Sequence, residues 1–473
     1  MGKPSSTEES LPASIAERPT AGSTRPRPSS KRAWALPRTP PGRSSTEQPP
    51  REGFTAPEVR FCYGSSMTFV LDAYDPEFLR DPYPVFDRIR EETPVFRGPG
   101  RAGERPIWFL TRHDDVRRAL RDRRLGRIDQ PTVDREAWGL PPLQDGLEPY
   151  YEVEHWALVW LEPPNHTKIR RLVSTAFTMR RLAGLRPRIA ELADRLLDPI
   201  VERGRFDLVD DYAAPLSVQV IAELLGVPTE DWRRMLDWSS LITQMYEYNI
   251  TGADTRAAVA ASVEFAEYCR DLMARRRARP RDDMITALCF ARTEDGTLTD
   301  TQIVSMIITL LNAGHEASVN TLANGMLALM QHPDQWGLLT GGEVDPATAA
   351  EELFRWDAPI QTFDRWVVAD SYEVGGQRIE QYEQVTVLLG CANRDPRHFD
   401  SPNSFRIGRG DPTHVSFGGG IHHCLGAPLA RLELEVALAR LATRCPQLEL
   451  VEQPVRPPRF VLRGFDSLRF ALA

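Results

Sequence analysis

The stretch Phe417-Gly-Gly-Gly-Ile-His-His-Cys424-Leu-Gly426 carries the strongest structural signal in this sequence. Three consecutive glycines allow the backbone to turn tightly and to approach a ligand closely. A strongly helical run begins at Ala427, and Pro428 suits its first turn. Cys424 is therefore predicted just before a helix N-terminus, where free N–H groups and a partial positive charge favour a thiolate. A thiolate held in a glycine-rich loop is a metal ligand or a nucleophile.

Two other interpretations of this loop are weaker. A buried structural cysteine accounts for a tight turn, but not for a motif of this length followed at once by a helix. Zinc is disfavoured because the adjacent His422, His423 and Cys424 point in different directions and no fourth ligand is evident.

The loop resembles the haem-binding signature of the bacterial cytochrome P-450 family at every fixed position. These positions are Phe417, Gly418, Gly420, His422, Cys424 and Gly426. The resemblance implies that Cys424 ligates the iron of haem b and that the other five residues bind the cofactor. It also implies that the anionic sulfur donates electron density to the iron and favours O–O cleavage.

Composition narrows the class of protein. The chain has 473 residues, of which 41% are hydrophobic and 26% charged, which is ordinary globular usage. A net charge of −8 argues against a nucleic-acid-binding protein. The six cysteines are scattered without a C-x-x-C pair, which excludes a disulfide framework and fits a reducing compartment. The most apolar run, 303–311, falls short of the ~20 residues of a membrane span, and no signal peptide is evident. We expect a cytoplasmic protein without membrane contact.

The chain divides into a tail and one domain. Residues 1–65 are rich in Pro, Ser, Thr, Arg and Gly, and we expect them to be disordered. Residues 66–473 are expected to form a single, mainly α domain with small β-sheets, an α+β arrangement. Apolar periodicity and capping signals predict helices over 181–203, 213–225, 255–278 and 299–331. Strands are predicted near 366–368, 372–379, 385–389 and the C-terminus. The resemblance implies a cytochrome P-450 fold, with haem between the long distal helix 299–331 and the cysteine loop.

A second motif is the pair Glu352 and Arg355, on a helix expected to start at Asp345 and Pro346. The i,i+3 spacing places acid and base on one helix face. Spacing alone indicates a surface ion pair worth ~0.5 kcal/mol or less. The resemblance implies more, because these residues match the family's E-x-x-R pair, which is completed by an arginine further along the chain. Arg406 and Arg409 are both candidates.

A third motif, Pro163-Pro164-Asn-His166-Thr-Lys-Ile-Arg170, looks like the family's H-x-x-x-R helix. Haem carries two propionates, which need cationic or hydrogen-bonding partners when partly buried. The resemblance implies that His166, Arg170, Arg365 and His422 are those partners. Ala392-Asn-Arg-Asp-Pro396 and Arg463-Gly464-Phe465 also match, so the resemblance covers roughly residues 72–473.

The long helix 299–331 contains one departure from the family. A glycine inside a helix costs ~1 kcal/mol relative to alanine, and close helix packing is one reason to keep it. The resemblance instead implies that Ala313 and Gly314 open a groove for dioxygen and that Glu316 helps deliver protons. The next position is usually threonine, but here it is Ala317, followed by Ser318. Three interpretations account for the missing threonine hydroxyl, in this order of preference. Ordered water with a substrate hydroxyl replaces it, or Ser318 replaces it through a local kink of the helix. In the third interpretation, the reaction depends less on this hydroxyl.

The resemblance implies an O2- and NAD(P)H-driven monooxygenase that hydroxylates a small organic substrate of secondary metabolism. Oxidative coupling or another non-hydroxylating oxidation is the alternative. A haem-binding sensor is disfavoured by the presence of Glu316 and the Ala313–Gly314 pair.

The substrate pocket is expected to be lined by residues ~125–155, ~230–250, Ile360 to Phe363 and the neighbourhood of Phe465. No flavin-binding or iron–sulfur segment is recognised, so we expect a ferredoxin and its reductase to supply electrons near Cys424. The basic residues expected to assist docking are Lys168, Arg171, Arg180, Arg181 and Arg431.

Overall fold

The computed structural model describes residues 73–98, 105–128, 132–140, 142–174, 177, 179–293 and 296–472. The predicted tail 1–65 lies outside the described residues. The helices that precede the long one are α1 (Pro76–Arg80), α2 (Tyr83–Glu92), α3 (His113–Ala119), α4 (Glu148–Glu154), α5 (Asn165–Ser174), α6 (Met179–Arg203), α7 (Ala214–Leu225), α8 (Trp232–Thr243), α9 (Gly252–Ala278) and α10 (Met284–Cys289). The later ones are α11 (Asp300–Gln331), α12 (Pro333–Thr340), α13 (Pro346–Trp356), α14 (Leu389–Ala392) and α15 (Ala427–Arg444).

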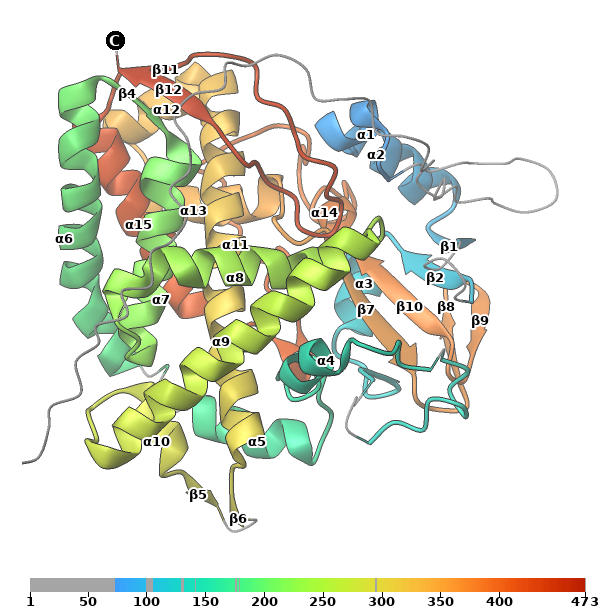
Figure 1. Cartoon of the computed structure of the whole chain (residues 1–473). Coiled ribbons are helices and arrows are strands. Elements are labelled where there is room, and N and C mark those ends of the chain that lie inside the picture. The colour runs from blue at the N-terminus through green and yellow to red at the C-terminus, as the bar shows by residue number, and fades with distance from the viewer. Residues whose placement is uncertain are drawn as a thin grey trace, which may run out of the picture. The chain divides into compact units, whose positions relative to one another are not determined.

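The strands of the described residues form four small sheets. The largest has the order β1 (Val95–Gly98), β2 (Ile107–Leu110), β10 (Gln384–Leu388), β7 (Thr362–Val367) and β3 (Leu125–Gly126). Within it only β10 and β2 run parallel. A second sheet joins β11 (Leu448–Leu450), β12 (Arg469–Leu472) and β4 (Arg205–Asp207). Two hairpins, β5–β6 (Arg292–Thr293, Gly296–Thr297) and β8–β9 (Ser371–Val374, Gln377–Glu380), complete the set. The mainly helical fold with small sheets confirms the predicted class (Figure 1).

The predicted helices are confirmed with small shifts at their ends. The capping box of Thr299 and Gln302 is formed, with a hydrogen bond in each direction, and α11 begins one residue later. Gly226 ends α7 in the left-handed conformation, with φ 86°. Helix α9 starts at Gly252, three residues before the predicted start, because Thr251 and Asp254 form a second capping box.

The strand predicted over 372–379 is wrong as a single element. Gly375 and Gly376 adopt φ values of 57° and 76°, so the chain reverses there and the segment forms the β8–β9 hairpin. The strand predicted at 366–368 begins earlier, at Thr362, and thus includes Arg365, which lies opposite Val385 of β10.

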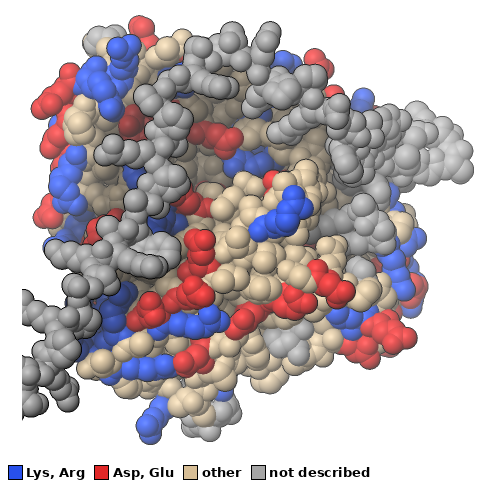
Figure 2. Space-filling model, viewed as in Figure 1, with Lys and Arg blue, Asp and Glu red and all other residues tan. Residues whose placement is uncertain are grey.

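Helix α11 runs through the helical half of the domain, and most of its apolar side chains are buried (Figure 1). It packs against α7, α4 and α9. The main core joins these helices to α6, α13 and α15, while a smaller core lies between the five-stranded sheet and α3. None of the described helices is long and apolar enough to cross a membrane. On the face seen in Figure 2, acidic and basic side chains are interspersed.

Helix α15 carries a buried carboxyl group that makes stability depend on pH. Glu433 is buried between α15 and α7, where the Ser217 hydroxyl donates to it, and burial raises its pKa to about 7. An acid whose pKa is raised by folding stabilises the fold fully only below its unfolded value of 4.5. That stability is lost as pH rises through 7.

We therefore expect Glu433→Gln to raise the free energy of unfolding above pH 7 by up to about 3 kcal/mol relative to the parent protein. Near pH 4.5 we expect the two free energies to be equal. Urea unfolding of both proteins from pH 4.5 to 8.5 measures this difference. A difference that does not change with pH would contradict the assignment.

Candidate functional site

The glycine-rich loop has the backbone that its sequence predicts. Gly418 and Gly420 adopt φ values of 65° and 66°. A Cβ atom on Gly420 would lie 2.5 Å from the Leu120 carbonyl oxygen, so only glycine fits beside α3. The Cys424 N–H donates to the Phe417 oxygen at 2.9 Å, which closes the loop. Helix α15 begins three residues later, at Ala427, as predicted.

The Cys424 side chain is accessible, whereas the other described cysteines are buried or half-buried. Protein atoms nevertheless surround the sulfur closely, and desolvation raises the pKa of its thiol. Backbone N–H groups of Gly426 and Ala427 act in the opposite direction, as do the charges of Arg170 and Arg431. The helix terminus thus favours the thiolate as predicted, but it does not outweigh desolvation. A bound metal cation would deprotonate the thiol outright.

A buried cationic cluster adjoins the loop through His422. Its Nε2 atom lies 3.0 Å from Glu162 Oε1, and its ring lies 4.6 Å from the ring of His166. Arg365 is 1% exposed, and the one hydrogen bond of its guanidinium to a described residue is from Nη1 to the Asp364 carbonyl oxygen, at 3.0 Å. Arg127 donates to Glu162, to the Val159 carbonyl and to the Asp364 carbonyl.

Burial shifts the protonation equilibria of this cluster. Together with the neighbouring charge of Arg127, it lowers the pKa of Arg365 to about 9. The pKa of His422 is lowered to about 4, because burial outweighs the hydrogen bond to Glu162, which acts to raise it. For Glu162, hydrogen bonds from His422 and from the Arg127 backbone outweigh burial and hold the pKa below its usual value. The cluster therefore holds two buried arginines and neutral imidazoles around one carboxylate.

The cluster has hydrogen-bonding capacity that its own residues leave unused. Arg365 Nη2 and His166 Nε2 are buried and have no hydrogen-bond partner within the part of the chain that the structure describes. A buried guanidinium nitrogen without an acceptor is costly, and an anionic oxygen is the partner that relieves this cost. A haem would supply such partners, because its two propionates are carboxylate groups that could lie beside the accessible thiol. The residues present fit that cofactor.

Arg170 is placed differently from the other three predicted propionate partners. Its Nη2 donates to the His423 carbonyl oxygen at 2.7 Å, on the backbone directly before Cys424. The charge of Arg170 also acts on Cys424 and on His166. In this structure Arg170 therefore supports the cysteine loop.

The Glu352–Arg355 pair is fully buried, so the surface interpretation of its spacing is wrong. Arg355 donates to both Glu352 oxygens, at 2.7 and 2.8 Å. Arg409 completes the group with a bond from Nε to Glu352 Oε2 at 3.0 Å, while Arg406 contributes only its backbone N–H. Arg355 also donates to the Asn393 carbonyl, and Asn393 donates to Ser416, beside the cysteine loop. The pair thus supports that loop.

On α11, Gly314 lies in a close helix contact. A Cβ atom there would lie 2.5 Å from Ile221 Cγ1 of α7, so packing is one reason for the glycine. Ala313 is accessible, and Ala317 and Ser318 are half-buried. The helix runs without interruption from Asp300 to Gln331, which gives no support to the interpretation that Ser318 acts through a local kink.

Glu316 faces α8. Its Oε1 atom lies 3.3 Å from the Thr243 hydroxyl oxygen and 3.8 Å from His315 Nε2. Its side chain is 18% exposed.

Sequence reasoning missed Arg127, Glu162 and Thr243. Glu162 stands immediately before the Pro163–Pro164 motif, and that position was the available signal. Arg127 and Thr243 belong to no motif. Arg127 joins the cluster because Trp160 and Phe363 surround its guanidinium, with ring centroids 4.1 and 4.6 Å away.

Comparisons with known proteins found similar sequences and structures. A model of the family "Cytochrome P450" matches residues 200–336 and 348–461. Cytochrome P450 107B1 of Saccharopolyspora erythraea is 38% identical over 81% of this chain and 92% of its own length. The 6-deoxyerythronolide B hydroxylase of the same organism is 37% identical over 85% of this chain and 98% of its own length. The solved structure of P450BioI, in complex with an acyl carrier protein ligated to a fatty acid, is similar with a TM-score of 0.77. It is 32% identical and covers 84% of this chain and 99% of its own.

Proposed function

The chain belongs to the cytochrome P450 family and is a haem-dependent monooxygenase of small organic substrates, and we propose that Cys424 is the thiolate ligand of its haem iron. The observation that carries this proposal is the accessible Cys424 thiol in a glycine loop beside buried, unpartnered donors. Arg365, His422 and His166 would receive the propionates, with Arg127 holding Glu162 in place. Phe417, Gly418, Gly420 and Gly426 would shape the loop around the cofactor.

Bound haem supplies the iron at which dioxygen is activated with two electrons from a redox partner. The protein residues then have separate tasks. Arg170 and the Gly426 and Ala427 N–H groups stabilise negative charge on the Cys424 sulfur. On the opposite side, Glu316 would pass protons from solvent towards the pocket, with Thr243 beside it.

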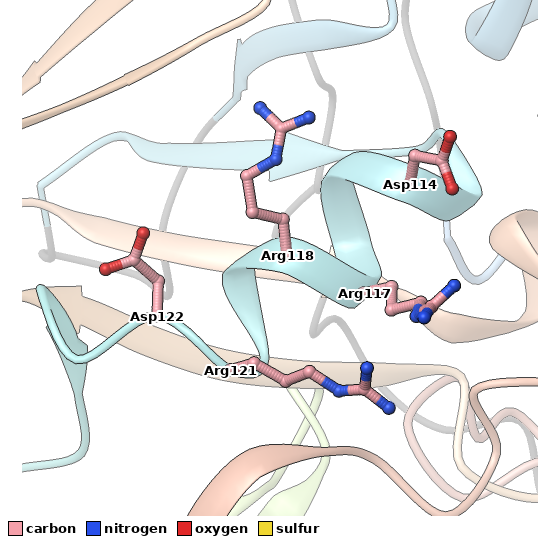
Figure 3. Close-up of a pocket in the computed structure, with 5 residues that line it drawn as sticks. All are labelled: Asp114, Arg117, Arg118, Arg121 and Asp122. Carbon is pink, nitrogen blue, oxygen red and sulfur yellow. The ribbon is translucent and has the colours of Figure 1, made fainter.

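We propose that electrons come from a ferredoxin and its reductase in the cytoplasm, with docking over the cysteine loop. Arg121 supports this, because its side chain lies against Gly419 and its charge acts on His423 together with Arg170 and Arg431. Arg431 is already paired with Glu351, and the side chains of Arg180 and Arg181 lie outside the described residues. Next to the loop, α3 carries a surface pocket of about 470 Å³ (Figure 3). It is lined by Asp114, Arg117, Arg118, Arg121 and Asp122. Lys168 and Arg171 of α5 remain further docking candidates.

A reconstituted assay tests the proposed function. The haem-loaded protein, with a surrogate ferredoxin, its reductase and NADPH, is screened against small molecules for a shift of the haem absorption band. Compounds that shift the band are expected to yield a product carrying one added oxygen atom. A coupled or dehydrogenated product without that atom would favour the second candidate function, for which the missing hydroxyl at Ala317 is the supporting observation.

Haem retention tests the role of Arg365. We expect Arg365→Ala to release haem to apomyoglobin about tenfold to a hundredfold faster, because a propionate loses a charge-assisted partner worth ~1.5–3 kcal/mol. Arg97→Ala is the matched control. Arg97 belongs to the same sheet, but its side chain is 49% exposed in an ion pair with Glu383. Equal release from both variants would contradict the assignment.

Ala317→Thr tests what replaces the missing hydroxyl. If water or a substrate hydroxyl uses the vacated volume, the larger side chain crowds the pocket, and overpacking costs ~1–3 kcal/mol. We expect weaker substrate binding or slower turnover. Equal affinity with clearly better coupling of NADPH to product would overturn this expectation. Ser318→Ala, one residue further along the same helix, is expected to leave coupling unchanged.

A further inference from the structure

Two histidines stack at the start of α3, away from the residues assigned above. The rings of His113 and His398 have centroids 3.5 Å apart and an angle of 13° between their planes. His113 is fully buried, and His398 is half-buried in the segment after α14. One ring nitrogen from each histidine and a carboxylate oxygen of Asp114 all lie within 4.8 Å of one another.

Thr413 determines the tautomer of both rings. The Nε2 atom of His113 lies 3.1 Å from the Thr413 carbonyl oxygen, which can only accept, so His113 carries its proton on Nε2. The Nε2 atom of His398 lies 2.8 Å from the Thr413 hydroxyl oxygen. That hydroxyl donates its own proton to Asp411 Oδ1 at 2.5 Å, so His398 also carries its proton on Nε2. Both Nδ1 atoms are therefore unprotonated and carry free lone pairs.

The lone pair of His113 has no donor facing it. Its Nδ1 atom is buried without a hydrogen-bond partner among the described residues, and Asp114 Oδ1, itself an acceptor, lies 3.7 Å away. Two acceptors facing each other at this distance repel unless a cation lies between them.

We propose that His113, His398 and Asp114 form a binding site for a divalent transition-metal ion, with Zn²⁺ as the ion that the donor set fits. Two imidazole nitrogens and one carboxylate oxygen are common zinc ligands, and water would complete the tetrahedron. Ligand atoms around tetrahedral zinc lie about 3.4 Å apart when the bonds are about 2.0–2.1 Å. The separation of His113 Nδ1 and Asp114 Oδ1 is close to this value.

The site requires one local movement. Because imidazole lone pairs lie in the ring plane, two parallel stacked rings cannot both point at one ion. His398 is the more accessible ring, and a tilt of it would let one of its ring nitrogens share an ion with His113 Nδ1 and the exposed Asp114 carboxylate. The N–H groups that both rings donate to Thr413 would orient them in the bound state, as outer-shell partners of zinc-binding histidines do. Arg397, next to His398 in the sequence, is already paired with Glu91 and Asp395, while Arg117 and Arg118 line a surface pocket together with Asp114.

Calorimetric titration of the untagged, haem-loaded protein with Zn²⁺ after chelator treatment tests the site. We expect one ion per chain to bind at this site, and an X-ray absorption spectrum at the zinc edge to show two imidazole ligands. His398→Ala and Asp114→Asn are each expected to weaken binding at least tenfold, and Thr413→Val about tenfold to a hundredfold. His398 and Asp114 are accessible, so these two variants are expected to fold.

Asp115→Asn is the matched control, because it removes the same charge from the next position of α3 without removing a ligand. It is expected to change the zinc affinity less than threefold. The proposal is overturned if the parent protein binds no zinc at 1 mM, if His398→Ala and Asp114→Asn bind as the parent does, or if Asp115→Asn weakens binding as much as Asp114→Asn.

Discussion

Replacing Cys424 with serine is expected to abolish the thiolate-type absorption spectrum of the reduced carbonyl complex while largely preserving the fold. A serine hydroxyl keeps its proton at neutral pH and cannot replace the soft sulfur anion as an iron ligand. The loop backbone does not need the sulfur, because it is held by the Cys424 N–H bond to Phe417 and by the left-handed Gly418 and Gly420. The measurement is the difference spectrum with carbon monoxide under reducing conditions, beside a circular dichroism spectrum.

Cys445→Ala is the control for this experiment. Cys445 is buried at the end of α15, and it belongs to none of the contacts of the cysteine loop. It is expected to leave the carbonyl spectrum unchanged, as is a substitution of Cys391. If Cys424→Ser retains the parent spectrum, Cys424 is not the ligand and the proposed function loses its central residue.

The largest expected effect on stability belongs to Glu352→Gln. The Glu352 carboxylate is 1% exposed and accepts hydrogen bonds from the Arg355 and Arg409 side chains and from the Arg406 backbone. Glutamine is nearly isosteric, but it leaves two buried guanidinium groups without their counter-charge. Breaking one partner of a buried ion pair costs about 3–5 kcal/mol. We expect the free energy of unfolding in urea to fall by that amount.

The chain offers a matched control in Glu435→Gln. Glu435 accepts two hydrogen bonds from Arg186, at 2.7 and 2.8 Å, with the same bidentate chemistry. Arg186 is 52% exposed, however, and an exposed pair contributes only about 0–1 kcal/mol. If both variants lose the same amount of unfolding free energy, burial of the Glu352 group does not increase its contribution to stability, and the prediction is wrong.

Most of the secondary structure and the cysteine loop could be predicted from local sequence. The capping residues of α11, the left-handed Gly226 after α7 and the glycines before Cys424 all act within a few residues of their own position. Such signals are readable because the conformational preference or hydrogen bond involved is complete within one turn of the chain. The β8–β9 hairpin was not predicted, although the adjacent Gly375 and Gly376 are a turn signal in the sequence.

Partners that are distant in sequence were not predictable in the same way. The spacing of Glu352 and Arg355 could not reveal that both are buried, and nothing local distinguishes Arg409 from Arg406 as the third member. Arg127 belongs to no motif, and it lies 35 residues before Glu162 and 238 residues before Arg365. Its backbone N–H donates to Glu162, and its charge lowers the pKa of Arg365.

The sequence by itself determined the loop that presents Cys424, the course of α11 and the family to which the chain belongs. Only the tertiary structure decided which charges are desolvated together, which atoms of Arg365 and His166 lack partners, and that Thr413 sets the tautomers of His113 and His398. The physical reason is one of range. Backbone preferences are set by neighbouring residues, whereas burial, hydrogen-bond satisfaction and Coulomb interactions depend on whatever the folded chain brings within a few ångströms.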